Sequence, residues 1–232
     1  MALAFAPKSV IVSRSGKRPQ KSTRSVRDAA TTQQQILDAA EQEFARHGLK
    51  GARMSAIAQM AQVTSATLHY YFQSKENLYK SVLQRPVDEV QSILAQQDFA
   101  ALSPEMALQQ MIRIAIANEA ANPQRQMLWF QESSQNQGAY FKECNVLTLH
   151  EYLLKVLERG IAEGVFRPIK PFLALTYILS VCLFYFTVHQ NWQHLTPEID
   201  RLSPTQIEAH TQEAIAFILA ALKPEKSQAE SP

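Results

Sequence analysis

The 232-residue chain contains few glycines and almost no cysteine. Only six residues are glycine, and because glycine takes positive φ most easily, hairpins and tight β-turns should be rare. The two cysteines, Cys144 and Cys182, lie far apart and make no metal-ligand spacing, so we expect buried, reduced thiols and no bound metal. No segment alternates as a β-strand does. The sequence therefore predicts an all-α fold of about nine helices.

Sequence motifs typical of enzymes are missing as well. There is no glycine-rich phosphate loop and no nucleophile elbow, and His150, His189 and His194 lack the spacing of a zinc-binding HExxH helix. We therefore predict no catalytic residues, no cofactor and no enzymatic activity.

Long apolar segments are also scarce. The charges near the start follow the apolar residues instead of preceding them, unlike those of a secretory signal. The most apolar stretch, residues 172–188, has 17 residues, which is at the short limit for a membrane helix, and it includes Thr, Ser and Tyr. We expect a helix buried in a core or between subunits of a cytoplasmic protein, with no membrane contact.

The charges are distributed unevenly along the chain. Residues 1–85 hold 13 Lys and Arg against 5 Asp and Glu, whereas residues 86–232 hold 10 against 16. A basic first third suggests a polyanionic partner such as nucleic acid. The alternative is a solvated basic tail, because residues 1–30 alone carry seven of the basic residues and one acid.

Composition and periodicity divide the chain into four parts. Residues 1–30 have no periodicity and are predicted to be a disordered basic arm, which either contacts DNA or has little role. Residues 31–85 are predicted to form a DNA-binding unit, residues 86–223 a ligand-binding and dimerisation unit, and residues 224–232 a flexible tail.

Capping signals predict where the helices begin and end. Thr32 and Gln35 fit a capping box, and Gly48 fits the position after a helix end. Pro86 should interrupt or kink the helix that starts after Ser74. The other helices are expected near residues 55–61, 65–72, 103–121, 123–135, 140–163 (with a bend near Asn145), 171–191 and 203–222.

The short third helix is the most informative segment. Its pattern, VTSATLHYYF, directs Val63, Leu68 and Phe72 inward and leaves small, hydroxyl and aromatic residues outside. Three helices with a short turn between the second and third form a helix-turn-helix, which places its last helix in the DNA major groove. The alternative is that Tyr70 and Tyr71 pack between helices.

Residues 57–78, IAQMAQVTSATLHYYFQSKENL, resemble the signature of the TetR/AcrR family. The matching positions include Val63-Thr64, Thr67, Tyr71-Phe72, Ser74-Lys75-Glu76 and Leu78. The resemblance implies an all-α homodimer that binds a palindromic operator and leaves it when a small ligand enters the C-terminal domain.

The predicted DNA contacts lie on and around this helix. We expect phosphate contacts from Tyr71 and Lys75, and base contacts from Ser65, Ala66 and His69. The full set of candidate DNA-binding residues is Ser55, Thr64, Ser65, Ala66, Thr67, His69, Tyr70, Tyr71 and Lys75.

Several residues depart from the family pattern. Gln62 stands where a glycine is usual, so either Gln62 takes positive φ at a cost or the turn differs. Ala66 and His69 replace other common residues, and Arg53-Met54 replace a threonine that often caps the second helix. Because these changes fall on the DNA face, the operator sequence cannot be carried over from the family.

The second half of the chain holds enough aromatic residues for an apolar pocket. Arg113 interrupts an apolar helix face and has three readings, namely a pocket wall, an ion pair with Glu132, or simple exposure. The candidate ligand-binding residues are Arg113, Trp129, Phe130, Tyr152 and Tyr185. The function predicted is a transcriptional repressor released from DNA by a small, largely apolar ligand. The alternative is a helical adaptor without sequence-specific DNA binding.

Overall fold

The computed structural model describes residues 22–224, and within that range it is built of helices without a strand. The all-α prediction is confirmed. The α-helices are α1 (Ser22–Gly51), α2 (Met54–Met60), α3 (Ser65–Phe72), α4 (Lys75–Ala95), α5 (Pro104–Ala121), α6 (Arg125–Asn136), α7 (Val146–Ala162), α8 (Pro171–Leu195) and α9 (Pro204–Leu222), with a short 3₁₀ helix, η1 (Phe141–Glu143).

The first helix begins earlier than the sequence predicted. Helix α1 starts at Ser22, so Thr32 lies inside a helix instead of capping one, and the disorder predicted for residues 22–30 is wrong. No glycine or proline lies between Ser22 and His47, so nothing in this segment forces the helix to stop. Residues 1–21 of the predicted arm and residues 225–232 of the predicted tail lie outside the described residues.

The break near the end of α1 falls at the predicted glycine. Gly48 has φ 64° and ψ −179° inside the run assigned to α1, which kinks there. A Cβ at this position would lie 2.1 Å from the Gln135 side chain of α6. The positive φ favours glycine here, whereas a Cβ would only displace the end of the flexible Gln135 side chain.

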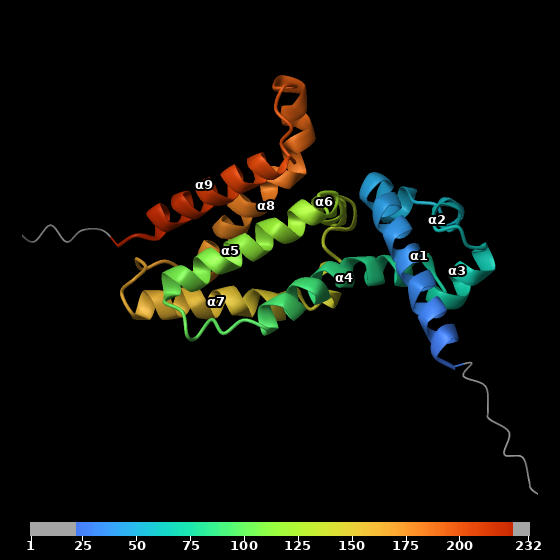
Figure 1. Ribbon diagram of the computed structural model, residues 1–232, viewed down its shortest axis with the longest axis horizontal. Coiled ribbons are helices and arrows are strands. Elements are labelled where there is room, and N and C mark those ends of the chain that lie inside the picture. Colours follow the sequence, from blue (N-terminus) through green and yellow to red (C-terminus); the bar gives the residue numbers. More distant parts are fainter. Residues whose placement is uncertain (1–21, 225–232) are drawn as a thin grey trace, which may run out of the picture.

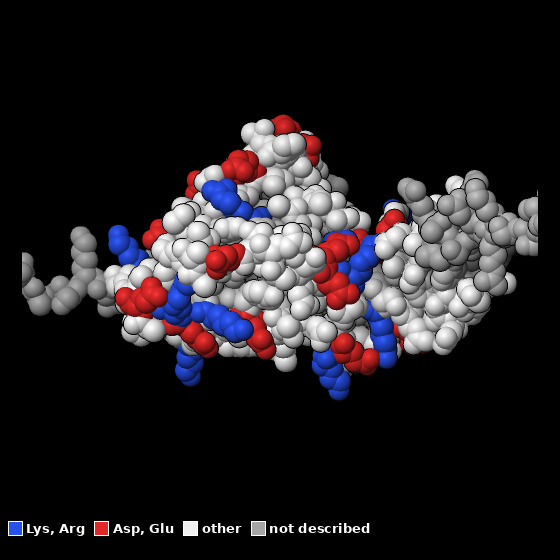
Figure 2. All heavy atoms as spheres, turned by 60° about the horizontal axis from the view of Figure 1, so that its bottom comes forward, with Lys and Arg blue, Asp and Glu red and all other residues white. Residues whose placement is uncertain are grey.

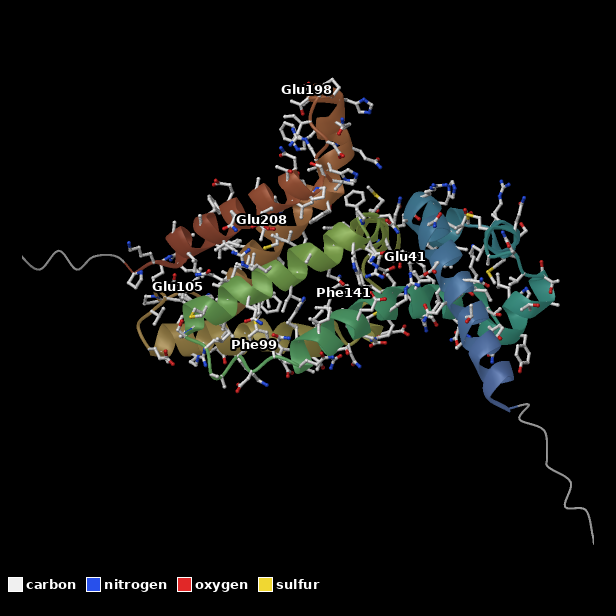
Figure 3. All side chains as sticks on the ribbon, viewed as in Figure 1. Glu41, Phe99, Glu105, Phe141, Glu198 and Glu208 are labelled. Atoms are coloured by element: carbon white, nitrogen blue, oxygen red, sulfur yellow. The ribbon has the colours of Figure 1, made fainter. Side chains whose placement is uncertain are left out.

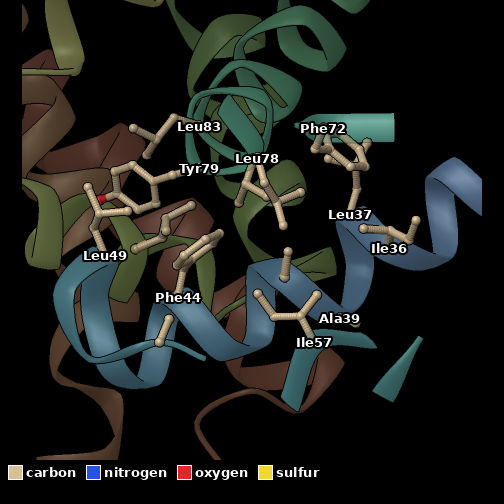
Figure 4. Packing of buried hydrophobic residues seen from close by; sticks show 14 of the residues in the cluster. Ile36, Leu37, Ala39, Phe44, Leu49, Ile57, Phe72, Leu78, Tyr79 and Leu83 are labelled. Atoms are coloured by element: carbon tan, nitrogen blue, oxygen red, sulfur yellow. The ribbon is translucent and has the colours of Figure 1, made fainter. Parts of the chain in front are cut away.

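Helices α1 to α4 surround the first of two hydrophobic cores (Figure 4). Phe44 packs edge-on against Tyr79 with ring centroids 4.9 Å apart, and both side chains are fully buried. Three residues from later in the chain complete the same core, namely Leu128, Cys144 and Val146. The N-terminal core is therefore closed by α6 and the segment after it.

Helix α4 connects this core to the second one. It runs without interruption from Lys75 to Ala95 with Pro86 inside it, so of the two outcomes predicted for Pro86, an interruption or a kink, the interruption is wrong. Proline removes one backbone hydrogen bond from a helix interior. However, Leu83, Pro86 and Val87 are all buried, and packing on that face holds the helix together.

The second core lies among α5, α7, α8 and α9, which form a helical bundle at the other end of the molecule (Figure 1). The single helix expected over residues 140–163 is divided into η1 and α7, because the backbone leaves helical geometry at Cys144 and Asn145. Cys144 and Cys182 are buried free thiols, as predicted, and burial raises the pKa of Cys144 to about 11 and that of Cys182 to about 12.

Helix α8 is long and apolar enough to cross a membrane by length and composition, yet only 28% of its most apolar window is buried in the monomer. Its exposed apolar side chains include Leu173, Tyr177 and Phe184, which recur at helical spacing along one face. Phe217 of α9 is exposed as well. The bundle thus presents an uncovered apolar surface.

A buried ion network joins α1, α4 and α6. Glu41 of α1 accepts hydrogen bonds from Arg85 of α4 and from Nε of Arg125, which begins α6. It lies where α1 faces the two other helices (Figure 3). Arg85 also pairs with Asp38, and Nη1 of Arg125 lies 2.6 Å from Oε2 of Glu89. Glu41 therefore pairs with two guanidinium groups from two different helices, and Asp38 and Glu89 supply further negative charge.

Removing the central charge should destabilise the protein strongly. In Glu41→Gln, Arg85 and Arg125 would stay buried without their shared carboxylate, and the loss of one partner of a buried pair costs about 3–5 kcal/mol. Asp38→Asn is the matched control, because the Asp38 side chain is 64% exposed, and an exposed pair contributes about 0–1 kcal/mol. Urea unfolding of both variants measures the difference. Equal losses would contradict the central role of Glu41.

Candidate nucleic-acid interface and effector cavity

The turn between α2 and α3 contains Gln62, the residue that stands where the TetR/AcrR signature usually has glycine. Gln62 has φ 55°, so of the two options for this turn the chain takes positive φ at a non-glycine residue. The next residues restore regular structure, because the side-chain oxygen of Thr64 accepts from the backbone N–H of Thr67 at 3.1 Å. This cap fixes where α3 begins.

The start of α2 lacks a side-chain cap. Arg53 occupies the capping position and makes no capping hydrogen bond with its side chain. Its backbone N–H instead donates to Oε1 of Glu43 at 3.0 Å. A carboxylate from α1 thus satisfies one of the donors around this helix start.

Helix α3 divides its residues between two faces as the sequence predicted. Leu68 and Phe72 are buried and Val63 packs against the same core. The other face carries Ser65, Ala66, His69 and Tyr70, which are exposed, and Tyr70 is 81% exposed. Ser55 and Thr64 are exposed, whereas Thr67 and Tyr71 are half-buried. The Tyr70 and Tyr71 rings contact each other edge-on. Tyr70 is therefore not packed between helices.

Lys75, the first residue of α4, makes hydrogen bonds that hold α4 to the end of α1. Its Nζ donates to the carbonyl oxygens of Lys50 and Ala52 at 3.3 and 3.2 Å. These carbonyls belong to the end of α1 and the residue after it, so Lys75 ties α4 to α1. Two of the three ammonium donors are engaged, and one remains.

Charges of both signs are interspersed on the face of the molecule drawn in Figure 2, with a broad uncharged surface between them. No large field of one sign covers this side of the described bundle. The candidate DNA face is accordingly defined by the exposed residues of α3 and the cap at Thr64.

An apolar cavity of about 290 Å³ lies where α4 enters the second core. Its wall is lined from five helices and η1, by Pro86, Val87, Val90, Leu94, Met111, Ile114, Ala115, Trp129, Phe141, Val146, Leu149, Leu153, Leu179 and Leu183. The polar lining residues are Asn118, Glu119, Gln126 and His150. Such a cavity suits a small molecule with a largely apolar body.

Of the five candidate ligand-binding residues, the structure places only Trp129 in this wall. Arg113 is exposed, and its Nη1 lies 3.7 Å from Oε1 of Glu208 on α9. Phe130 is 54% exposed on the other side of α6. Arg113, Phe130, Tyr152 and Tyr185 do not line the cavity. This cavity therefore brings together only part of the predicted set, because helical periodicity does not reveal which neighbouring helix covers each face.

Tyr185 and Glu132 have structural partners instead. The Tyr185 hydroxyl donates to the carbonyl oxygen of Arg201 at 2.7 Å, and its ring stacks on His210. Glu132 accepts from the hydroxyl of Tyr79 at 3.0 Å and from the backbone N–H of Tyr140 at 2.7 Å. Glu132 therefore stabilises the contact between α4 and α6 and does not pair with Arg113.

Sequence reasoning missed Glu119. This residue follows Ile112, Ala115 and Ile116 at helical spacing, so the same periodicity that marks the inner face of α5 also marks Glu119. Glu119 is 7% exposed. Its Oε2 finds no hydrogen-bond partner among the described residues.

Burial is the main cause that raises the pKa of Glu119 above its ordinary value. The Gln126 side chain and the Arg125 guanidinium lower it again in part. Burial likewise lowers the pKa of His150. The cavity therefore contains an acid that ionises reluctantly and a histidine that favours its neutral form.

Known protein families match most of the chain. Residues 36–82 match the model of bacterial regulatory proteins of the tetR family, and residues 104–218 match the tetracyclin repressor-like C-terminal domain. The chain belongs to the TetR family. It is thus a DNA-binding transcriptional regulator and not an enzyme, and the adaptor alternative is set aside.

Individual TetR-family relatives agree with this assignment. The transcriptional repressor NicS of Pseudomonas putida is 28% identical over 163 residues, which cover 68% of this chain and 76% of NicS. The regulator RutR of Escherichia coli is 36% identical over 99 residues, 42% of this chain and 45% of RutR.

Solved structures of other regulators share the fold of this chain over most of their length. The fatty acid degradation regulator FadR of Bacillus halodurans has a TM-score of 0.62 at 25% identity, covering 82% of this chain and 99% of FadR. A putative transcriptional regulator of Streptomyces coelicolor has a TM-score of 0.63 at 23% identity, covering 82% and 98%. The latter likeness shows the fold alone.

The raised pKa of Glu119 predicts a pH-dependent stability difference. A carboxyl group with a raised pKa in the folded state contributes stability that is present below its ordinary pKa of 4.5 and is lost as the pH rises through the folded pKa. Glu119→Gln removes this titration, so the variant should gain stability relative to wild type as the pH rises above 4.5. Urea unfolding at several pH values measures the gain.

Glu105→Gln is the control for this experiment, because Glu105 lies on the same helix with an exposed side chain. If the stability gained over wild type rises with pH as much in Glu105→Gln as in Glu119→Gln, burial of Glu119 is not the cause.

Proposed function

We propose that this TetR-family regulator is a cytoplasmic homodimeric repressor that binds a palindromic operator and releases it when a small, largely apolar ligand enters the cavity. The observation that carries the DNA-binding part is the outer face of α3. A capped helix of eight residues buries Leu68 and Phe72 and exposes Ser65, Ala66, His69 and Tyr70. This is the arrangement of a recognition helix.

We assign the DNA contacts by chemistry and exposure. Ser65, Ala66 and His69 are exposed near one another in the sequence of α3, and small or polar groups there allow close approach to base edges. Tyr70 and Tyr71 offer hydroxyl groups to phosphates, together with the free donor of Lys75. Ser55, Thr64 and Thr67 lie around the turn and support backbone contacts.

The presence of two hydrophobic cores supports the following division of roles. Residues 31–85 carry the DNA contacts, and residues 86–223 carry the ligand cavity and the dimer surface. The basic residues of the N-terminal arm add electrostatic attraction to the DNA backbone. The exposed apolar face of α8, with Phe217 of α9, is the proposed dimer interface.

The cavity supports ligand-controlled release because of the helix that forms its wall. Pro86, Val87 and Val90 of α4 line it, and α4 also carries Leu78 and Val82 into the DNA-binding core. A ligand that favours one position of α4 therefore changes where α3 lies. Two half-sites demand a fixed spacing of about 34–36 Å, so a small shift unseats one of them.

Variants of α3 should separate base contacts from phosphate contacts. After the operator is selected from random DNA with the wild-type protein, His69→Ala should change the preferred sequence. Lys75→Ala should weaken all sequences alike and reduce the salt slope by about 1. Lys80→Ala is the control, because Lys80 lies on the same helix as Lys75 and pairs with Glu143 of η1 at 2.7 Å, and it should leave both properties unchanged. A changed preference in Lys75→Ala would overturn its role.

A charge in the exposed face of α8 should prevent dimerisation. Phe184 is 60% exposed, so Phe184→Glu leaves the monomer core intact while placing a carboxylate in the proposed interface. Light scattering after gel filtration should then report a monomer with weakened operator binding. Phe130→Glu, at a similarly exposed position on α6, should stay dimeric. A dimeric Phe184→Glu that binds operator normally would refute the interface.

A further inference from the structure

Glu119 is the one acidic side chain in a cavity wall made mainly of hydrocarbon. Only 7% of the Glu119 residue is exposed to solvent. Its Oε2 has no hydrogen-bond partner among the described residues. A buried acceptor without a donor costs roughly 1–3 kcal/mol, and more for a charged group. In a functional cavity, such an atom points to a partner supplied by a ligand.

The Gln126 and Asn118 side chains interact with the Glu119 carboxyl group but leave its Oε2 without a partner, and the nearby cation is engaged elsewhere. Arg125 is the nearest cation that influences Glu119. However, Nε of Arg125 is directed to Glu41, and its Nη1 lies 2.6 Å from Oε2 of Glu89. His150 lines the same cavity, but burial lowers its pKa. Neither residue therefore supplies a positive charge inside the cavity.

We propose that the effector is a largely apolar molecule with one hydrogen-bond donor, an amine or a hydroxyl group, which Glu119 recognises through Oε2. The apolar body contacts the α4 and α7 walls near Val87, Leu149 and Leu153. An effector with a carboxylate at this end is disfavoured, since it would bring a second acid beside a buried one. This inference rests on the proposed function, because it takes the cavity as the effector site.

The position of Glu119 also links the donor to the ion network. The carboxyl group interacts electrostatically with Arg125 and, less strongly, with Glu41. These two residues hold α6 against α1. A donor placed at Glu119 thus acts on the charges that fix the DNA-binding helices.

Trp129 provides a direct binding signal for the test. The chain has two tryptophans, of which Trp129 lines the cavity and Trp192 is exposed on α8. In the background Trp192→Phe, fluorescence therefore reports the cavity alone. Decylamine, 1-decanol and decanoate are titrated below their aggregation concentrations into the full-length dimer, because they share one chain and differ only at the head group.

The proposal predicts that decylamine and 1-decanol bind and decanoate binds more weakly. Glu119→Gln should weaken decylamine by about ten- to a hundredfold, the range of a lost charged hydrogen bond, and 1-decanol by less. The amine and alcohol arms distinguish a cationic from a neutral donor. Ala115→Phe, which fills the cavity, should weaken all three probes.

Two results would overturn the proposal. One is tight decanoate binding that Glu119→Gln leaves unchanged, and the other is binding of none of the probes. Operator release is measured separately with the same probes. If a probe binds in a way that depends on Glu119 but leaves the operator complex intact, the effector role is refuted. Recognition of the probe by Glu119 is then still supported.

Discussion

The shared carboxylate of Glu41 is the constraint on which the arrangement of the two cores depends. Burying two guanidinium groups is costly unless each is paired, and here a single acid pairs with both Arg85 and Arg125. Because the three residues belong to α1, α4 and α6, no one of these helices can shift freely without exposing or unpairing a buried charge. The geometry of the DNA-binding helices is thereby tied to the C-terminal half.

Helix α4 connects the ion network to the cavity, because its residues belong to both. Arg85 and Glu89 hold the ion network, while Pro86, Val87 and Val90 line the cavity. A helix presents successive residues to different sides, so one turn can contact both. The same physical element thus contacts the proposed effector site, the ion network and the core behind α3. This gives ligand binding a route to DNA binding that needs only a two-state shift of one helix.

The first hydrophobic core includes residues from both sides of Pro86. The boundary predicted near Pro86 therefore does not separate two independently packed cores. Leu128 and Val146 complete a core that α1 to α4 do not close alone, and the Gln135 side chain of α6 reaches Gly48 of α1. In contrast to this core, the apolar face of α8 is not covered by any other element of the monomer that the structure describes. The C-terminal half thus completes the core of the N-terminal helices and also presents an apolar surface that the monomer leaves uncovered.

The sequence by itself determined features that depend on neighbours along the chain. The helix starts after Ser74 and near residue 103, the break at Gly48 and the inward positions of Leu68 and Phe72 follow from local hydrogen bonding and periodicity. The family resemblance rested on the segment that holds α3. Only the tertiary structure decided that Arg113 faces solvent while Glu119 faces the cavity. Both lie on α5, and which face is buried depends on α4, α7 and α8, whose distance and angle no local pattern encodes.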